Sequence, residues 1–370
     1  VTRCYTELHG VTRCYIMLHG VTWCYTLVLH GGTGFYTVLH AVTWCYRVLH
    51  GVSWCYTILQ GVTRFYRVLH GVSWCYTVLH SLTRCYMVFH GVTGCYTVLH
   101  GVTRCYMLLH GVRGCYTVLH DTRCYGVLHG VSCCYTLLQG VTRCFLSCYM
   151  LLQGGTPCFM VLQGALWCFR VLHGVAGWYS VLQGASRGFK VLHGQIHVVT
   201  GCYTVFYGVT RCCIVLQGVT WCYTVLHAAI GCYMVLDGVS WCYTILKGVT
   251  GCYMVFHGVT WCSTVFHGVT RSYKVLRGVT WCYMVLRGVT CCYRVLDGVL
   301  QGVTWCYTEL HSVTGCYMVL HDVTGCFMVL HGVTRCFMVV HVVTGCYTVL
   351  QSVTRCYRVL HRVSWCYRGL

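Results

Sequence analysis

The chain is one decapeptide written about three dozen times, with the consensus Gly-Val-Thr-Arg-Cys-Tyr-Thr-Val-Leu-His. We number its positions as slots one to ten, from the Gly to the His. A tandem repeat restricts the fold because each unit buries its apolar face only against neighbouring copies of itself. No compositional boundary or Pro/Ser-rich linker interrupts the 370 residues, and Pro157 is the sole proline. The sequence therefore predicts a single array over residues 1–370 without separable domains.

The decapeptide resembles the translation of a ten-base DNA repeat. The bases GGTGTTACAC, read three times in succession, give GGT GTT ACA CGG TGT TAC ACG GTG TTA CAC, and these codons encode the consensus. Ten is not divisible by three, so each unit uses all three reading phases, and none of them contains a stop codon. The chain is therefore identified as a minisatellite-like open frame, and no characterised protein family is indicated.

The substitutions between units follow the codons. All but one of the 12 Trp residues occupy slot four, where CGG becomes TGG, and all but one of the 11 Met residues occupy slot seven, where ACG becomes ATG. Both are C-to-T changes at CpG steps, the commonest spontaneous lesion of methylated DNA. The most variable slots are four, seven and ten, a spacing of three. A half-buried strand would vary with a period of two and a helix with a period of 3.6, so the variation is interpreted as mutational.

The repeat slips register near residues 20–30, 121–129, 144–153, 194–207 and 298–301. Every frame of the DNA repeat encodes the same cyclic decapeptide, so an insertion or deletion leaves the pattern readable. In a folded solenoid we expect each slip to be a fault, because it displaces the inward side chains by one or more places.

The composition predicts an all-β fold. Val, Thr, Cys and Tyr favour extended backbone, a ten-residue period leaves no fixed apolar face on a helix, and the slot-one Gly is a turn signal. We expect a repetitive decapeptide β-solenoid in which each unit is one coil, so that about thirty-six coils would make a rod on the order of 170 Å long. Small Cys, Val and Thr side chains would fill its narrow interior, whereas inward Tyr or Arg would be hard to accommodate. The alternatives are an antiparallel meander and a disordered or aggregating cross-β polymer.

Charge and cysteine content set further limits. The net charge of +19 comes from 25 basic and 6 acidic residues spread along the chain, and 35 Cys arrive at about one per unit. Equal spacing and an odd total fix no disulfide pairing. No signal-peptide pattern and no apolar run long enough to cross a bilayer is present. A low-complexity, cysteine-rich chain with 57% hydrophobic residues is expected to be aggregation-prone and to self-associate.

Few residues in the sequence are candidates for a catalytic or metal-binding role. Cys and His recur as in Cys75 to His80 and Cys95 to His100, but on one strand these residues have opposite parity and point to opposite faces. No Cys-x-x-Cys with a matching His pair stands out. The thiols are nearly equivalent and no carboxylate recurs, so none is singled out as an activated nucleophile. The sequence therefore predicts no catalytic, cofactor-binding or metal-binding residues, no cofactor and no enzyme activity.

Three functional interpretations stay open. The first is a spurious or uncharacterised repeat protein without an evolved biochemical function. The second is a structural or ice-binding solenoid, since the period alone is similar to that of some insect antifreeze proteins. Those proteins need a flat array of Thr or Tyr and cystines within each coil, whereas Met, Arg and Lys interrupt slot seven here. The third is weak, nonspecific binding of nucleic acid, other polyanions or metal through Arg/Tyr/Trp and Cys/His ladders at low salt. No specific partner is predicted.

Overall fold

The chain forms β-strands joined by short turns. The computed structural model describes residues 3–10, 12–29, 31–120, 124–139, 148–155, 158–164, 167–175, 177–184, 187–193, 199–297 and 303–369. It divides into two compact units, Val1–Ala185 and Ser186–Leu370. The strands of the first unit are β1 (Arg3–His9), β2 (Arg13–His19), β3 (Trp23–Leu29), β4 (Gly34–His40), β5 (Trp44–His50), β6 (Trp54–Gln60), β7 (Arg64–His70), β8 (Trp74–His80), β9 (Arg84–His90), β10 (Gly94–His100), β11 (Arg104–His110), β12 (Arg113–His120), β13 (Cys124–His129), β14 (Ser132–Gln139), β15 (Cys148–Gly155), β16 (Cys158–Gln163), β17 (Trp167–Val175) and β18 (Gly177–Gln183).

The second unit repeats the same design. Its strands are β19 (Arg187–His193), β20 (Val199–Tyr207), β21 (Arg211–Gln217), β22 (Val219–His227), β23 (Gly231–Asp237), β24 (Trp241–Lys247), β25 (Gly251–His257), β26 (Trp261–His267), β27 (Arg271–Arg277), β28 (Trp281–Arg287), β29 (Cys291–Asp297), β30 (Val303–His311), β31 (Gly315–His331), β32 (Arg335–Gln351) and β33 (Arg355–Gly369). The last three are long because the backbone pairing continues around the bend between two decapeptides.

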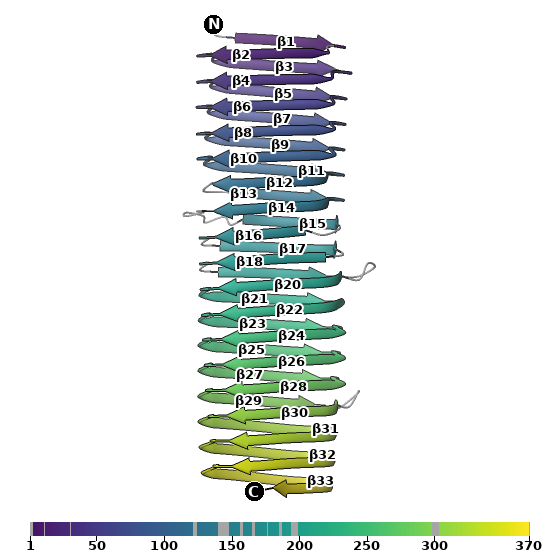
Figure 1. Cartoon of the computed structure of the whole chain (residues 1–370), viewed down its shortest axis with the longest axis vertical. Helices are drawn as coiled ribbons and strands as arrows, with labels where there is room; N and C mark the ends of the chain where they lie inside the picture. Colours follow the sequence, from purple (N-terminus) through teal and green to yellow (C-terminus); the bar gives the residue numbers. More distant parts are fainter. Residues whose placement is uncertain are drawn as a thin grey trace. The chain divides into compact units, whose positions relative to one another are not determined.

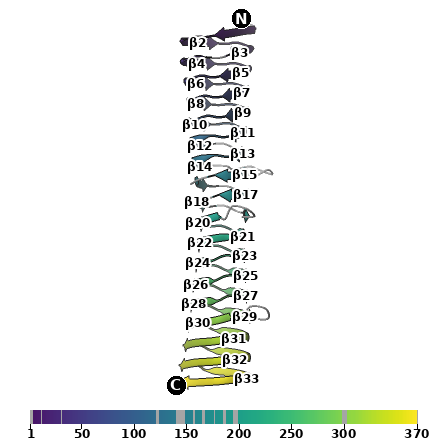
Figure 2. The ribbon, with the colours of Figure 1, turned by 90° about the vertical axis from the view of Figure 1, so that its right-hand side faces the viewer.

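Within each unit, a typical strand pairs in parallel with the strands two places before and two places after it. Tyr56 of β6, for example, lies between Tyr36 of β4 and Tyr76 of β8. Odd- and even-numbered strands of a unit therefore form two facing ladders, which Figures 1 and 2 show as alternating arrows and as two columns of strand labels. One coil consists of two decapeptides.

The all-β, parallel solenoid prediction is confirmed, but the prediction of one decapeptide per coil is wrong. A seven-residue strand followed by a three-residue turn reverses the chain only once, so a coil closes after two such units. The wider coil also admits residues that a ten-residue coil would exclude. The strand pairs recorded across the described ranges are parallel, which rules out the antiparallel meander for these strands.

The turn at slot one requires a left-handed backbone. Gly51 has a φ of 65°, and its amide donates a hydrogen bond to the carbonyl of His70 in the next coil at 2.9 Å. Glycine adopts this conformation without steric cost, whereas a Cβ makes it unfavourable. Several units nonetheless keep a positive φ with another residue in slot one, namely Ala41, Ser81, Ala228, Ser312, Asp322, Val342, Ser352 and Arg362.

Side chains alternate between an interior and an outer face. In β6 and the turn before it, Val52, Cys55, Thr57 and Leu59 are buried. Slots two, five, seven and nine therefore line the interior, while slots four, six, eight and ten point outward. The prediction that Cys, Val and Thr fill the interior is confirmed, and the Tyr side chains lie outside as expected. The prediction that Arg would not fit is wrong, because the coil of two decapeptides admits Arg47 in its interior.

The register slips leave strand pairing intact where the structure describes it. Beside the slip at 20–30, Trp23 pairs with Trp44, and beside the slip at 121–129, Cys105 pairs with Cys124. Across the slip at 144–153, Cys134 pairs with Cys158. The expectation that each slip displaces the inward side chains is therefore wrong for these strands, because like slots remain paired. The slip at 298–301 lies outside the described residues, and the other four slips lie partly outside them.

Candidate functional site: stacked side-chain columns

Parallel stacking converts each slot into a column. Neighbouring strands lie about 4.8 Å apart and pair like with like, so identical side chains repeat at that spacing. A side chain that occurs once in each decapeptide is therefore repeated as a regular column in the folded unit. The inward columns carry Val, Cys, Thr and Leu, and the outward columns carry Arg or Trp, Tyr, Val and His.

The predicted Cys and His candidates lie on opposite faces. Cys75 and Cys95 point inward and are 3% and 4% exposed, whereas His80 and His100 lie on the outside. The prediction from strand parity is confirmed. Among the described residues, no three or more His, Cys, Asp or Glu side chains gather in a way that could hold a metal ion. No disulfide joins the cysteines that the structure describes.

The buried thiols are inaccessible to a substrate. Cys75 Sγ lies 3.4 Å from Thr77 Oγ1, and Cys95 Sγ lies 3.3 Å from Thr97 Oγ1. Burial raises the pKa of the Cys55 thiol, and its hydrogen bond with Cys75 adds to the rise. A nucleophilic thiolate needs access to its substrate as well as a depressed pKa, and these buried thiols lack that access.

The interior also contains cations. Slot seven carries Arg47, Arg67, Lys274 and Arg294 at four positions where the side chain is at most 1% exposed. They occur as neighbours in pairs, because Arg47 pairs with Arg67 and Lys274 pairs with Arg294 in adjacent coils. Like charges are therefore neighbours in the interior, where solvent does not reach them.

These cations donate hydrogen bonds to thiols and hydroxyls rather than to carboxylates. Arg294 Nη2 donates to Cys282 Sγ at 3.2 Å and to Cys306 Sγ at 2.9 Å, and its Nη1 donates to the Thr308 hydroxyl. Its Nε has no hydrogen-bond partner. Hydrogen bonds from Cys262 and Cys306 lower the pKa of Cys282, and the charge of Arg294 lowers it further. The guanidinium group therefore lies among thiols and a hydroxyl and has no carboxylate beside it among these contacts.

Lys274 is held in the same way. Its Nζ donates to Thr264 Oγ1 at 2.6 Å and to Cys262 Sγ at 3.5 Å, and it lies 4.6 Å from the centre of the Phe256 ring. These contacts replace only part of the hydration that the ammonium group has in water.

Aromatic rings stack along the outer face. Tyr46, Tyr66 and Tyr86 have ring centres 4.8 Å apart and planes within 3° of parallel. Trp241 and Trp261 stack at 4.9 Å, and His70 and His90 at 4.7 Å. Each column presents ring edges to solvent at a fixed repeat.

Two grooves run between the slot-four and slot-six columns of the first unit. The groove that we call the arginine groove has a volume of about 660 Å³ and lies across β3, β5, β7, β9 and β11. Tyr25, Tyr46, Tyr66, Tyr86 and Tyr106 form one wall. Trp23, Trp44, Arg64, Arg84 and Arg104 form the other.

The second groove, which we call the glycine groove, belongs to the even-numbered strands. Its volume is about 1000 Å³, and its Tyr wall includes Tyr56 and Tyr76. Its opposite wall carries Trp54 and Trp74 and then opens at Gly114. This wall also contains Gly34, and the groove has a larger volume than the arginine groove because it extends over one more strand.

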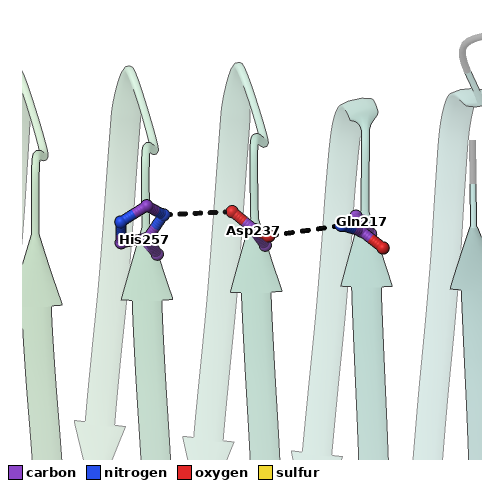
Figure 3. Close-up of polar contacts among 3 residues, drawn as sticks. All are labelled: Gln217, Asp237 and His257. Carbon is purple, nitrogen blue, oxygen red and sulfur yellow. Dashed lines mark hydrogen bonds and ion pairs between the residues drawn. The ribbon is translucent and has the colours of Figure 1, made fainter. Parts of the chain in front are cut away.

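An outward polar trio occupies slot ten of the second unit. His257 Nδ1 lies 3.1 Å from Asp237 Oδ1, and Gln217 Nε2 donates to Asp237 Oδ2 at 3.4 Å, as Figure 3 shows. These residues end β21, β23 and β25. A carboxylate beside an imidazole resembles half of a general-base arrangement, but the third position is Gln rather than a nucleophile and the pair is well exposed.

Sequence reasoning missed the paired interior cations and the Asp237–His257 pair. Both depend on which residues are twenty positions apart, and a coil of one decapeptide gives the wrong neighbours. The signal that could have found them was the recurrence of charged residues in one slot of alternate units, such as Lys274 and Arg294.

No known protein family, curated protein or solved structure matches the chain. Over the described ranges, no helix has the length and hydropathy to cross a membrane.

Proposed function

We propose that this chain is the translation of a ten-base tandem DNA repeat, without a selected catalytic, cofactor or metal site and without enzyme activity. The observation that carries the proposal is the composition of slot seven. This slot faces the interior, yet it contains Arg47, Arg67, Lys274 and Arg294 alongside Thr and Met.

Buried cations without a carboxylate partner lower the stability of the fold. Removing an ammonium or guanidinium group from water costs several kcal/mol unless its partners compensate fully, and these cations have no carboxylate partner among the described residues. Selection for a stable interior would remove such residues. The codon ACG becomes AGG for Arg, AAG for Lys and ATG for Met by single base changes, so slot seven varies as its codon permits.

The DNA tests this proposal. We expect TTA for most slot-nine Leu residues, CGG for slot-four Arg and ACG for slot-seven Thr. Leucines written throughout as CTN, with codon usage typical of the host's other genes, would contradict the proposal.

A structural solenoid is the second candidate, and the regular Tyr columns favour it. Tyr56 and Tyr76 stack at 4.8 Å with parallel planes. The slot-seven residues Thr57 and Thr77 are fully buried, so they cannot serve as an ice-binding array. Ice binding would depend on Tyr alone, and measurable thermal hysteresis in a freezing solution would support that interpretation over the first.

Nonspecific binding follows from charge under either interpretation. Exposed Arg side chains recur on the outer face, so we expect weak, graded attraction to polyanions that falls steeply with added salt. Stoichiometric zinc binding with a cooperative gain of structure, or a DNA affinity that survives physiological salt, would contradict this expectation.

A further inference from the structure

We propose that the arginine groove binds planar aromatic anions, with the long axis of the ligand along the stack of strands. This inference goes beyond the proposed function, because a groove created by the fold binds its ligand whether or not it was selected. The groove has the shape and the charge for such a ligand, and the glycine groove has fewer cations.

The shape follows from strand geometry. Slots four and six point outward on either side of slot five, whose own side chain points inward, so the two columns form walls above a backbone floor. Five stacked strands give a trough about 19 Å long. Its volume of about 660 Å³ lies within the range of small-molecule sites. A flat, elongated molecule fits this trough better than a compact one.

The Tyr wall suits an aromatic ligand. The rings of Tyr46, Tyr66 and Tyr86 stack with nearly parallel planes, so their edges face the trough at a constant spacing. Ring edges are electropositive and attract the electron-rich face of another aromatic system. A fused or conjugated ring system lying along the trough would contact several Tyr edges at once.

The opposite wall favours a negatively charged ligand. Arg64, Arg84 and Arg104 are exposed and occupy successive positions of one column. The guanidinium carbon of Arg64 lies 4.1 Å from the ring centre of Trp44, which directs it along the wall. No Asp or Glu lines the groove. Three adjacent like charges repel one another, and a ligand with two anionic groups would relieve that repulsion.

The glycine groove provides a contrast within the same unit. It has a comparable Tyr wall, but its slot-four wall carries Trp54, Trp74 and Gly114, and its cation is Arg13 at one end. We therefore expect a planar anion to prefer the arginine groove, and a planar cation to prefer the glycine groove.

The test is equilibrium dialysis of the full chain against Congo red, a linear aromatic dye with two sulfonates, and against thioflavin T, a planar cation. The groove variant is Arg64→Gln/Arg84→Gln/Arg104→Gln. The matched control is Arg211→Gln/Arg271→Gln/Arg335→Gln, which removes the same charge from outward slot-four positions that do not form a run of three. Circular dichroism verifies that both variants keep their β-structure, which we expect because all six side chains are exposed.

We expect the groove variant to raise the dissociation constant for Congo red on the order of tenfold, because it removes charge-assisted contacts. The matched control should change it by less than about twofold. Thioflavin T binding should not weaken in either variant. A second variant, Tyr66→Val/Tyr86→Val, should also weaken Congo red binding while the strands persist.

Two outcomes would overturn the proposal. One is an unchanged Congo red affinity in the groove variant. The other is an equal loss in the groove variant and the matched control, which would mean that total charge rather than the groove governs binding.

Discussion

Replacing the paired interior cations of the second unit should stabilise the protein. Lys274 and Arg294 lie in one slot-seven column between Met254 and Met318, and all four side chains are buried. The double substitution Lys274→Met/Arg294→Met would make this stretch of the column continuous Met. Methionine is flexible enough to fill the space of either side chain.

The magnitude follows from the spacing. Two like charges about 5 Å apart repel by about 3 kcal/mol at an effective dielectric constant near 20. Replacing buried charged groups with apolar ones of similar volume is worth roughly 1–4 kcal/mol in other proteins. The Thr264 and Thr308 hydroxyls keep contacts with Cys262 and Cys306, so little new polar burial arises. We therefore expect a net gain of about 3 kcal/mol.

The pH dependence gives the same prediction a second readout. The folded pKa of Cys282 is depressed by hydrogen bonds from Cys262 and Cys306 and by Arg294. A thiol whose pKa is lower in the folded than in the unfolded protein stabilises the fold above the unfolded pKa, which is about 8.5. This stabilisation is lost as the pH falls through the folded pKa. The double variant lacks the Arg294 charge, so the pKa of Cys282 is lowered less and the variant loses less stability at acidic pH. Its advantage over the wild type should therefore be larger at acidic than at mildly alkaline pH.

The assay is urea unfolding followed by circular dichroism. The control is Arg271→Met, which removes an exposed cation from the same strand as Lys274 and should change stability by less than about 0.5 kcal/mol. If the double variant proves less stable than the wild type, the cations and their thiol partners contribute net stability. That outcome would refute the reasoning on which the proposed function depends.

Three further predictions concern the turn, alkaline pH and thiol access. Val342 holds a φ of 53° in slot one, so Val342→Gly should raise the free energy of unfolding by about 1–2 kcal/mol, and an equal or lower urea midpoint would contradict this. Burial raises the pKa of Cys262 to about 11 and also raises that of Cys212. A thiol whose pKa is higher in the folded than in the unfolded protein stabilises the fold below the unfolded pKa. Thermal stability should therefore fall as the pH rises from about 8.5 toward 11, and a melting temperature that does not change with pH would contradict the burial of these thiols away from water. Iodoacetamide should label the exposed Cys133 and Cys291 well before the buried slot-five thiols, and equal labelling of exposed and buried thiols in the native chain would show that the interior is open.

Much of the fold was predictable from the decapeptide. Strand-forming residues with Gly at slot one dictate short strands and turns, and identical units favour parallel stacking of like slots. Side-chain volume also placed Cys, Val and Thr inside and excluded Tyr, but it wrongly excluded Arg, which the wider coil accommodates in slot seven. These inferences needed only local propensity and the size of a narrow interior.

The coil length was not predictable from the period. Every decapeptide is equivalent in sequence, so a coil of one unit and a coil of two units have the same pattern. The three-residue turn decides between them, because it reverses the chain once. The neighbours of Lys274 and Asp237 follow from that choice, which is why the buried cation pair and the outward Asp237–His257 contact were missed.

The DNA of the repeat records whether selection has acted on any part of the chain. Synonymous and nonsynonymous differences between units should be counted separately for the inward slots two, five, seven and nine and for the outward slots four, six, eight and ten. We predict similar rates per site in both sets, as mutation without selection requires. A marked deficit of nonsynonymous differences confined to the inward slots would contradict the account, because it would mean that selection has maintained this interior.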